Sequence, residues 1–307
     1  MQYNTFLLPK ENHKIWSIIH KDMQNPCLSE KNKMKNPTVS VIIPCYNQAQ
    51  YLAECLDSVM AQTFQDFEVI VVNDGSTEGI DILQTLNYPK TTVIHQENKG
   101  ASEARNTAIK HAKGKYIFPL DADDMISEIT LEKAVSVLEN NPDVGIVGGK
   151  TELFGVKTGV WNLPLYKFPD ILRGNCLVCS CLFRRSDWEK VGGYNPNMVY
   201  GIEDWDFWLS IIELGRNVYQ FNDIFLYYRK KVTSRTTELN NKRSQMMIEQ
   251  IIENHPALYK KHPEIKNFLL NITPLSYKIK KSCLKFICLF IPVKSWRHKI
   301  RNYYKKG

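Results

Sequence analysis

The sequence lacks any apolar run long enough to cross a lipid bilayer. Its most apolar window, Cys283–Ile291, has nine residues and includes Lys285, whereas a membrane-spanning helix needs about 20 apolar residues. The first twenty residues place His13 and Lys14 among scattered apolar residues. No basic segment therefore leads into the continuous apolar stretch of a secretory signal. These absences predict a protein of the cytoplasm.

Cysteine is neither abundant nor spaced as a metal site. Eight cysteines in 307 residues are compatible with a reducing compartment. Cys176, Cys179 and Cys181 cluster, but zinc would need a fourth ligand at a usable spacing, and the neighbouring sequence has none. We interpret Leu177–Phe183 as a buried strand in which the cysteines are small core residues.

Acidic residues are absent from the last part of the chain. Residues 266–307 hold eleven of the 40 Lys and Arg residues and no Asp or Glu. Without this tail the chain carries 29 basic and 32 acidic residues, so the formal charge of +8 belongs to the tail. A body that leans acidic does not favour nucleic-acid binding.

The spacing of apolar residues in the tail predicts an amphipathic helix with a basic face. Apolar side chains recur at Val293, Trp296, Ile300 and Tyr303. Such a helix suits the surface of an anionic membrane, and we expect residues 283–307 to associate with one. The alternative is a helix packed on the body of the protein with its basic face in water.

Strands and helices alternate through the first half of the chain. This alternation predicts an α/β fold with a mainly parallel central sheet covered by helices on both faces. Expected strands are Val39–Ile43, Glu68–Val72, Thr91–His95, Tyr116–Leu120 and Val144–Val147, and expected helices are Ala49–Met60, 78–86, Ala101–His111 and Glu128–Glu139. After about residue 150 the alternation loosens, with a helix at Asp204–Leu214 and a strand at Val218–Tyr228. Residues 1–37 are expected to be an extension, and residues 236–307 a helical C-terminal region.

Two carboxylates follow the fourth expected strand directly. Asp121 and Asp123 lie where an α/β sheet presents its ligand crevice. They would repel each other without a cation between them, and Mg²⁺ or Mn²⁺ prefers carboxylate and phosphate oxygens. The alternative is that these residues begin a helix, where Asp is favoured, and Asp124 fits that structural role better.

Three further positions allow both a structural and a chemical role. Asp74 lies in a turn after a strand and could either shape the turn or accept a hydrogen bond from a nucleoside. Arg105 could meet a phosphate or form a surface ion pair. Glu203 and Asp204 begin an aromatic helix, where they could cap it or serve as a general base.

Taken in order, these segments resemble the family 2 inverting glycosyltransferases. The matching stretches are VSVIIPCYN (39–47), QYLAECLDSVMAQT (50–63), FEVIVVNDGST (67–77), ENKGASEARNTAI (97–109), GKYIFPLDADD (114–124), GGYNP (192–196) and EDWDFW (203–208). The resemblance covers about residues 38–230 and implies the nucleotide-sugar-binding α/β fold of the A type. It further implies a catalytic domain at 38–235, with a nucleotide-binding half (38–124) and an acceptor-binding half (125–235).

On the nucleotide side, the resemblance implies that Pro44, Tyr46, Asn47 and Asp74 pack against the nucleobase. It also implies that Arg105 lies near the nucleotide.

At the reaction centre, the resemblance implies that Asp121 contacts the ribose side and that Asp123 ligates Mn²⁺ or Mg²⁺ on the diphosphate. Asp204 would be the general base, with Glu203 as the second candidate. Trp205 and Trp208 could shape the acceptor side, and core packing explains them equally well.

The implied reaction is the transfer of a sugar from a nucleotide diphosphate to a hydroxyl of a glycan or lipid-linked glycan. UDP-hexose or UDP-N-acetylhexosamine is the expected donor, and lipopolysaccharide or capsule biosynthesis at the inner face of the cytoplasmic membrane the expected setting. A polyprenyl-phosphate acceptor is the alternative within enzymes, and a catalytically silent carbohydrate- or membrane-binding relative is the alternative outside them.

One motif departs from the family pattern. Similar proteins often have a His near a Ser after the last strand, whereas residues 228–235 contain no His. Arg229 and Arg235 are the candidates for supplying positive charge there.

Overall fold

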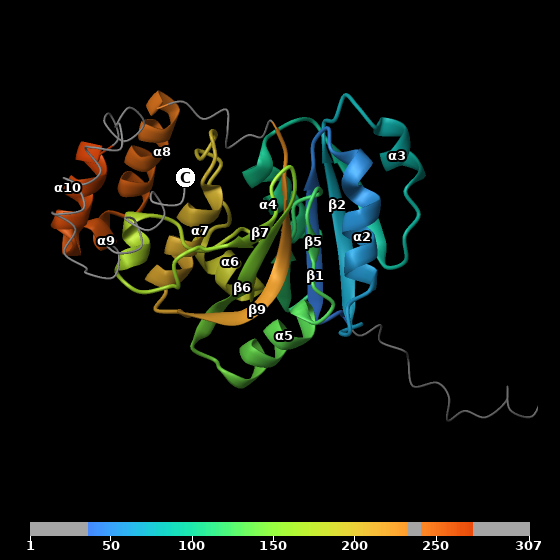
Figure 1. Cartoon of the computed structure of the whole chain (residues 1–307), viewed down its shortest axis with the longest axis horizontal. Coiled ribbons are helices and arrows are strands. Elements are labelled where there is room, and N and C mark those ends of the chain that lie inside the picture. Colours follow the sequence, from blue (N-terminus) through green and yellow to red (C-terminus); the bar gives the residue numbers. More distant parts are fainter. Residues whose placement is uncertain (1–35, 233–240, 273–307) are drawn as a thin grey trace, which may run out of the picture. The chain divides into compact units, whose positions relative to one another are not determined.

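The computed structural model describes residues 36–232 and 241–272, and from Pro37 onward these residues belong to one compact unit (Figure 1). The expected extension at 1–35, Arg235 and the tail at 283–307 lie outside the described residues. No helix in the two described ranges is both long and apolar enough to cross a membrane.

The described residues form one nine-stranded sheet at the centre of this unit. Its order is β3 (Thr91–Gln96), β2 (Phe67–Asp74), β1 (Val39–Cys45), β4 (Tyr116–Pro119), β8 (Leu182–Arg184), β6 (Val144–Gly155), β9 (Asn217–Lys230) and β5 (Met125–Ile126), with β7 (Gly159–Trp161) paired to β6. Strands β8, β5 and β7 are antiparallel to their neighbours, and the other six run in one direction. The prediction of a mainly parallel sheet is confirmed.

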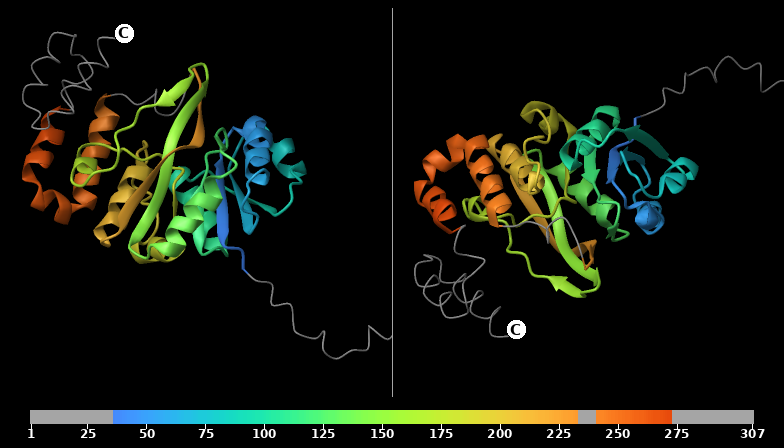
Figure 2. Two further views of the ribbon diagram at one scale, coloured as in Figure 1. Left: turned by 60° about the horizontal axis from the view of Figure 1, so that its bottom comes forward. Right: turned by 90° about the horizontal axis from the view of Figure 1, so that it is seen from above.

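Helices cover both faces of the sheet, because alternate residues of each strand point to opposite sides. In β1, Val41 and Ile43 join one core cluster, whereas Ile42 joins the other. The first cluster packs under η2 (Ala49–Tyr51), α2 (Leu52–Met60), α3 (Ile80–Thr85) and α5 (Thr130–Asn140). The second packs under α4 (Ala101–His111), α6 (Arg185–Val191), α7 (Glu203–Glu213), α8 (Asn241–Asn254), α9 (Pro256–Lys261) and α10 (Pro263–Ile272). Figure 2 shows α8–α10 at the end of the sheet away from β1–β3.

One predicted strand is wrong. The stretch Leu177–Phe183 is apolar, but only its last two residues belong to β8. Before them the chain turns, because the Cys181 amide donates to the Cys179 carbonyl at 2.9 Å. Cys181 and Leu177 are nevertheless buried, so the apolar pattern reports burial in a loop.

Four short elements were not predicted: β5, β7, α6 and η3 (Asp170–Arg173). The β5 strand has two residues and depends on pairing with β9, about a hundred positions away. Such a strand carries no periodic pattern of its own.

The C-terminal helices attach to α7 through the buried His255. Its Nδ1 lies 2.9 Å from Glu213 Oε2 and its Nε2 lies 3.3 Å from Asp206 Oδ1. Burial opposes the charged ring, but these two carboxylates outweigh it and raise the pKa of His255 to about 9. A protonated His255 therefore joins the start of α9 to both ends of α7.

This contact predicts a pH-dependent stability. Because the pKa of folded His255 lies above the ordinary histidine value of about 6.5, the stabilisation is complete below about pH 6.5 and is lost as the pH rises through about 9. His255→Gln should lower the free energy of unfolding by about 3 kcal/mol at pH 6 and by much less at pH 10. Urea denaturation at several pH values measures this.

The matched control is His262→Gln, because His262 lies 3.6 Å from the exposed Glu264. His262→Gln should lower the free energy of unfolding by less than about 1 kcal/mol. An equal loss for His255→Gln at pH 6 and pH 10 would contradict the assignment.

Candidate active site

The site is built around Arg105, a buried cation of α4. Its Nη2 donates to Asp121 Oδ1 and its Nη1 donates to Glu203 Oε1, both at 2.8 Å. The side chain is 3% exposed, and its guanidinium carbon lies 5.6 Å from the centre of the Tyr194 ring. Burial alone would lower the pKa of Arg105, but the charges of the neighbouring carboxylates raise it by more. The pKa therefore lies well above its ordinary value, and the side chain stays charged. Arg105 is therefore a buried bridge and not part of a surface ion pair.

Asp121 reaches this bridge from the carboxyl end of β4. The Leu120 amide continues the pairing of β4 with β1 by donating to the Ile42 carbonyl at 2.9 Å. The chain then turns, and the Asp124 amide donates back to the Asp121 carbonyl at 3.0 Å. Asp121, Asp123 and Asp124 therefore share one turn directly after β4, at the carboxyl end of the strand, where the sequence predicts a ligand crevice.

Glu203 and Asp204 begin α7 after a backbone in an unusual conformation. Ile202 has φ 55° and ψ 22°, in the left-handed region that branched side chains disfavour. Gly201 before it has φ 124°. Strain of this kind persists where the surroundings impose it and gathers at functional sites. Here it immediately precedes the first turn of α7, in which Glu203 contacts Arg105 and Asp204 contacts Asn175.

Asp204 is held by two hydrogen bonds and retains partial exposure. Asn175 Nδ2 donates to its Oδ2 at 3.0 Å, and the Trp205 amide donates to its Oδ1 at 2.8 Å. Burial and the negative charge of Glu203 raise the pKa of Asp204 to about 7, although Arg105 opposes the shift. A carboxylate with this pKa can accept a proton near neutral pH. Glu203 is bound to Arg105, so Asp204 is the better placed of the two to act as a base.

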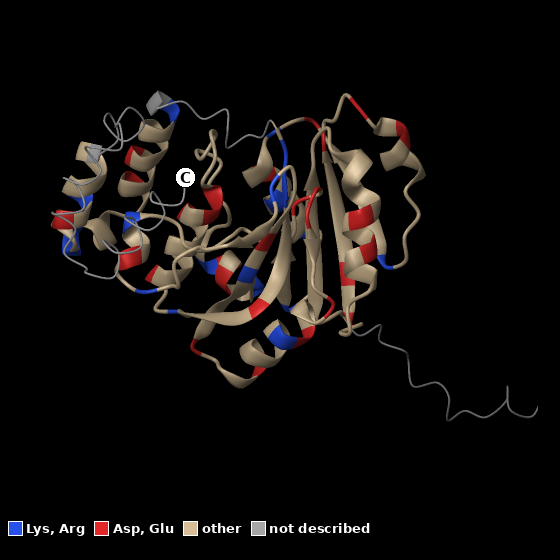
Figure 3. Cartoon of the chain, in the orientation of Figure 1, with Lys and Arg blue, Asp and Glu red and all other residues tan. Residues whose placement is uncertain are grey.

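Asp123 is paired with a lysine that sequence analysis did not single out. Lys231 Nζ, just beyond β9, lies 2.6 Å from Asp123 Oδ2. The Gln48 amide, oriented with its nitrogen toward Asp123, donates to Oδ1 at 3.0 Å and accepts from Lys231 Nζ at 3.1 Å. Figure 3 shows basic residues at the end of β9 beside the acidic residues of the β4 loop.

Asp124 has the structural role considered for it. It is 1% exposed, and its Oδ1 accepts from the Arg229 amide at 2.8 Å. Arg229 Nε donates to the Asp123 carbonyl at 2.9 Å, and its Nη2 lies 2.7 Å from Glu54 Oε2. Arg229 therefore fastens the end of β9 to the acidic loop.

The acidic loop has the chemistry of a divalent-cation site that the donor would complete. Burial and the charge of Asp121 raise the pKa of both Asp123 and Asp124, because each charged carboxylate is removed from water and lies near another one. Asp124 Oδ2 is buried with no hydrogen-bond partner in the described part of the chain. The described residues contain no ready-made group of three His, Cys, Asp or Glu ligands. The arrangement suits Mg²⁺ or Mn²⁺ held by one carboxylate and substrate phosphates.

The residues expected at the nucleobase lie together at the ends of β1 and β2. Asn47, with φ 53°, accepts at Oδ1 from the Thr77 amide at 2.8 Å, which ties the two loops together. Tyr46 is 48% exposed and Pro44 is partly exposed. Both side chains are therefore available to a ligand.

Asp74 shapes the loop that leads into α4. Its Oδ1 accepts from Gln96 Nε2 at 2.6 Å and from the Lys99 amide at 2.9 Å, and its Oδ2 accepts from the Gly100 amide at 2.9 Å. The next residue, Gly75, has φ +70°, and a Cβ there would lie 2.6 Å from the Asn98 nitrogen. The turn role of Asp74 is thus present in the structure, and its role toward a nucleobase stays a prediction.

Sequence analysis missed four residues whose side chains contact Asp121, Asp123 or Asp204: Asn175, Cys179, Gln48 and Lys231. Cys179 Sγ lies 3.5 Å from Asp121 Oδ2. No local pattern marks these residues, since each lies in a loop. Trp205 and Trp208 are 4% and 0% exposed, so core packing explains both.

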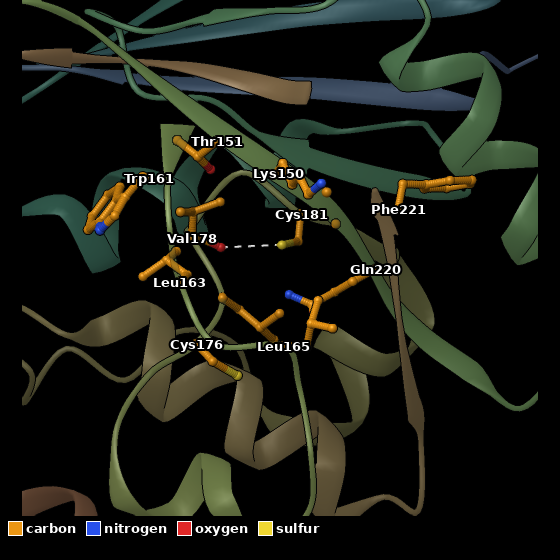
Figure 4. A pocket seen from close by; sticks show the side chains of 13 residues that line it. Lys150, Thr151, Trp161, Leu163, Leu165, Cys176, Val178, Cys181, Gln220 and Phe221 are labelled. Atoms are coloured by element: carbon orange, nitrogen blue, oxygen red, sulfur yellow. Dashed lines mark hydrogen bonds between the residues drawn. The ribbon is translucent and has the colours of Figure 1, made fainter. Parts of the chain in front are cut away.

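A small pocket lies next to the segment 175–181, which contributes Cys176, Leu177, Val178 and Cys181 to its lining. Asn175 and Cys179 of this segment face Asp204 and Asp121. Val178 and its neighbours line the pocket on the other side (Figure 4). Apolar side chains of the lining, among them Trp161, Leu163, Leu165 and Val178, meet three polar ones there: Lys150, Thr151 and Gln220.

Comparison with known proteins identifies the family. Residues 40–187 match the family described as Glycosyl transferase family 2. An uncharacterized glycosyltransferase of Rickettsia prowazekii is 30% identical over 224 residues, which cover 68% of this chain and 70% of that protein. One of Rickettsia felis is 30% identical over 285 residues, covering 83% of this chain and 46% of that protein. This chain thus spans about half the length of the second relative.

Two solved structures share the fold. TarS 1-349 of S. aureus in complex with UDP-GlcNAc has a TM-score of 0.58 at 20% identity, covering 81% of this chain and 78% of that one. Mannosyltransferase PcManGT of Pyrobaculum calidifontis, in complex with GDP-Man and Mn²⁺, has a TM-score of 0.57 at 22% identity, covering 88% and 80%. The fold is that of the A-type α/β glycosyltransferases. The chain belongs to glycosyltransferase family 2, and it is a glycosyltransferase.

The Arg105 bridge predicts a large stability loss when its charge is removed. Arg105→Met leaves Asp121 and Glu203 facing each other without compensation, and should lower the free energy of unfolding by about 4 kcal/mol. Adding Glu203→Gln to Arg105→Met removes one of the two charges and should recover part of that loss. Urea denaturation of the single and double variants measures both effects.

Lys133→Met is the control, because Lys133 pairs with Asp223 on the surface. It should cost less than about 1 kcal/mol. A comparable loss in Lys133→Met and Arg105→Met would contradict the central role of the buried bridge.

Proposed function

We propose that this glycosyltransferase inverts the anomeric centre as it moves a hexose or N-acetylhexosamine from a UDP-sugar to a hydroxyl of a glycan or lipid-linked glycan. The observation that carries the proposal is the Arg105 bridge, which joins Asp121 on one side to Glu203 on the other. Because Asp204 follows Glu203, the bridge places a candidate base beside the carboxylates proposed to receive the donor. Residues 38–124 would then supply the nucleotide side and residues 125–235 the acceptor side.

Asp204 would act as the general base of a single displacement. As the acceptor oxygen bonds to the anomeric carbon, the bond from that carbon to the diphosphate oxygen breaks, and Asp204 takes the hydroxyl proton. Asn175 keeps one Asp204 oxygen oriented through its 3.0 Å hydrogen bond. One base and attack from the face opposite the diphosphate give inversion. Arg105 would position Asp121 and Glu203, because both of its terminal nitrogens are already bound to them.

Asp123 would hold Mn²⁺ or Mg²⁺ together with the donor's phosphates, and Asp121 would contact the ribose side. Such a cation supplies positive charge to the departing diphosphate. The Mn²⁺ named in the PcManGT complex supports this choice of metal. The raised pKa of Asp123, caused by burial and by Asp121, marks a carboxylate that a cation would stabilise.

The similar structures hold UDP-GlcNAc in one case and GDP-Man in the other, which supports a nucleotide-diphosphate sugar as the donor class. Pro44, Tyr46, Asn47 and Asp74 would contact the base of either nucleotide. A polyprenyl phosphate is the second candidate acceptor, and an organic-soluble product would identify it.

The function is tested by screening nucleotide sugars as donors for the wild type and for the Asp204→Asn variant. The wild type should turn over one nucleotide sugar in the presence of Mn²⁺, and its kcat/KM should rise with pH through about 7 as Asp204 loses its proton. Asp204→Asn should lower kcat at least about 100-fold while donor binding stays within about twofold. Steady-state kinetics and calorimetry measure these values.

Glu189→Gln is the control, since Glu189 lies on the surface of α6 with its side chain 56% exposed. It should leave kcat unchanged. Retained turnover in Asp204→Asn would rule out the base assignment, and failure of every nucleotide sugar to bind would rule out the donor class.

We further propose that residues 283–307 hold the enzyme at the anionic inner face of the cytoplasmic membrane. This rests on the basic composition and apolar spacing of the tail, which lies outside the described residues. Deleting 283–307 should abolish sedimentation of the protein with vesicles of phosphatidylglycerol, while donor hydrolysis continues. Equal sedimentation of the full and shortened chains would contradict the proposal.

A further inference from the structure

We propose that Lys231 is a diphosphate-binding residue that rests on Asp123 while no donor is bound. The inference builds on the proposed function, because it assumes that the donor carries a diphosphate. It gives this chain a cation of its own at the position where family members often have a histidine.

The resting contact is close and partly buried. Lys231 Nζ lies 2.6 Å from Asp123 Oδ2, and the two side chains are 23% and 14% exposed. The same ammonium lies 3.1 Å from the Gln48 amide oxygen and 5.3 Å from the centre of the Tyr51 ring. Lys231 therefore joins the end of β9 to the loop after β1 across the acidic loop.

The main chain beside Lys231 is fixed, whereas its side chain can turn. Arg229 anchors the end of β9 through its amide on Asp124 and its Nε on the Asp123 carbonyl. A lysine carries its charge on a flexible four-carbon stem with rotatable donors. The ammonium can thus leave Asp123 for a group in the same crevice without movement of the strand.

A divalent cation and Lys231 need the same carboxylate. An ammonium 2.6 Å from Asp123 Oδ2 occupies the space in which a metal would approach that oxygen. When Asp123 takes a divalent cation together with a donor, Lys231 loses its carboxylate partner. The arriving diphosphate supplies new anionic oxygens at that moment.

Two other cations in the described part of the site, Arg105 and Arg229, already have partners of their own. Arg105 is bound to Asp121 and Glu203, and Arg229 is bound to Glu54 and to the Asp123 carbonyl. Neither loses its partner when a metal occupies Asp123. Of these three cations, Lys231 is the one that the donor's arrival releases, and its ammonium then binds the diphosphate.

Two binding measurements test the inference with Lys231→Met. Mn²⁺ binding to the protein alone, followed by the electron paramagnetic resonance signal of free Mn²⁺, should become about fivefold tighter because a competing cation is gone. UDP binding at saturating Mn²⁺, followed by calorimetry, should become about tenfold weaker because a phosphate contact is lost. Lys231→Arg keeps the charge and should hold UDP within about threefold of the wild type.

The matched control is Lys230→Met, which removes the same charge one residue away. The Lys230 ammonium lies over the Trp161 and Tyr228 rings, 4.7 and 4.8 Å from their centres. This variant should match the wild type in both measurements.

Equal Mn²⁺ affinity in the wild type and Lys231→Met, including no binding in either, would overturn the resting contact. Unchanged UDP affinity in Lys231→Met, while the wild type binds UDP with Mn²⁺, would overturn the phosphate role alone. A wild type that binds neither UDP nor GDP would overturn the proposed function and the phosphate role with it.

Discussion

The Arg105 guanidinium, buried between Asp121 and Glu203, is the interaction on which the rest of the site depends. Removing a charge from water is costly unless partners of opposite sign surround it, so the three groups hold one another in place. Asp121 belongs to the strand half of the fold and Glu203 to the helix that carries the candidate base. A single side chain thereby joins the end of β4 to the start of α7. Asp204 follows Glu203 there, with one oxygen held by Asn175.

The first half of the fold follows closely from sequence patterns. The β-branched run that begins at Val39 and the helix Ala101–His111 appear within two residues of their predicted bounds, because each buries a face whose period the sequence displays. The second half follows less closely. Leu177–Phe183 is as apolar as a strand, but its burial comes from a loop packed against the sheet. The β5 strand exists because β9 pairs with it, and a partner so far along the chain leaves no local signal.

The site residues could likewise be predicted only where the local sequence marks them. Asp121 and Asp123 could be singled out because the end of a parallel strand is where an α/β sheet binds ligands. The pairing of Arg105 with Glu203 could not be predicted, because the two residues lie 98 positions apart and only the folded chain brings them together. Lys231 could not be predicted for a different reason. Its contact with Asp123 depends on the direction of the lysine side chain, which residue spacing does not reveal.

The bridge also bears on the order in which the protein is made. Synthesis runs from the N-terminus, so Arg105 and Asp121 leave the ribosome well before Glu203 does. Until the second half arrives, the nascent sheet holds a cation with half of its counter-charge and a main edge at β4 that lacks β8. Arg105 gains its second carboxylate only when Glu203 and the start of α7 are in place.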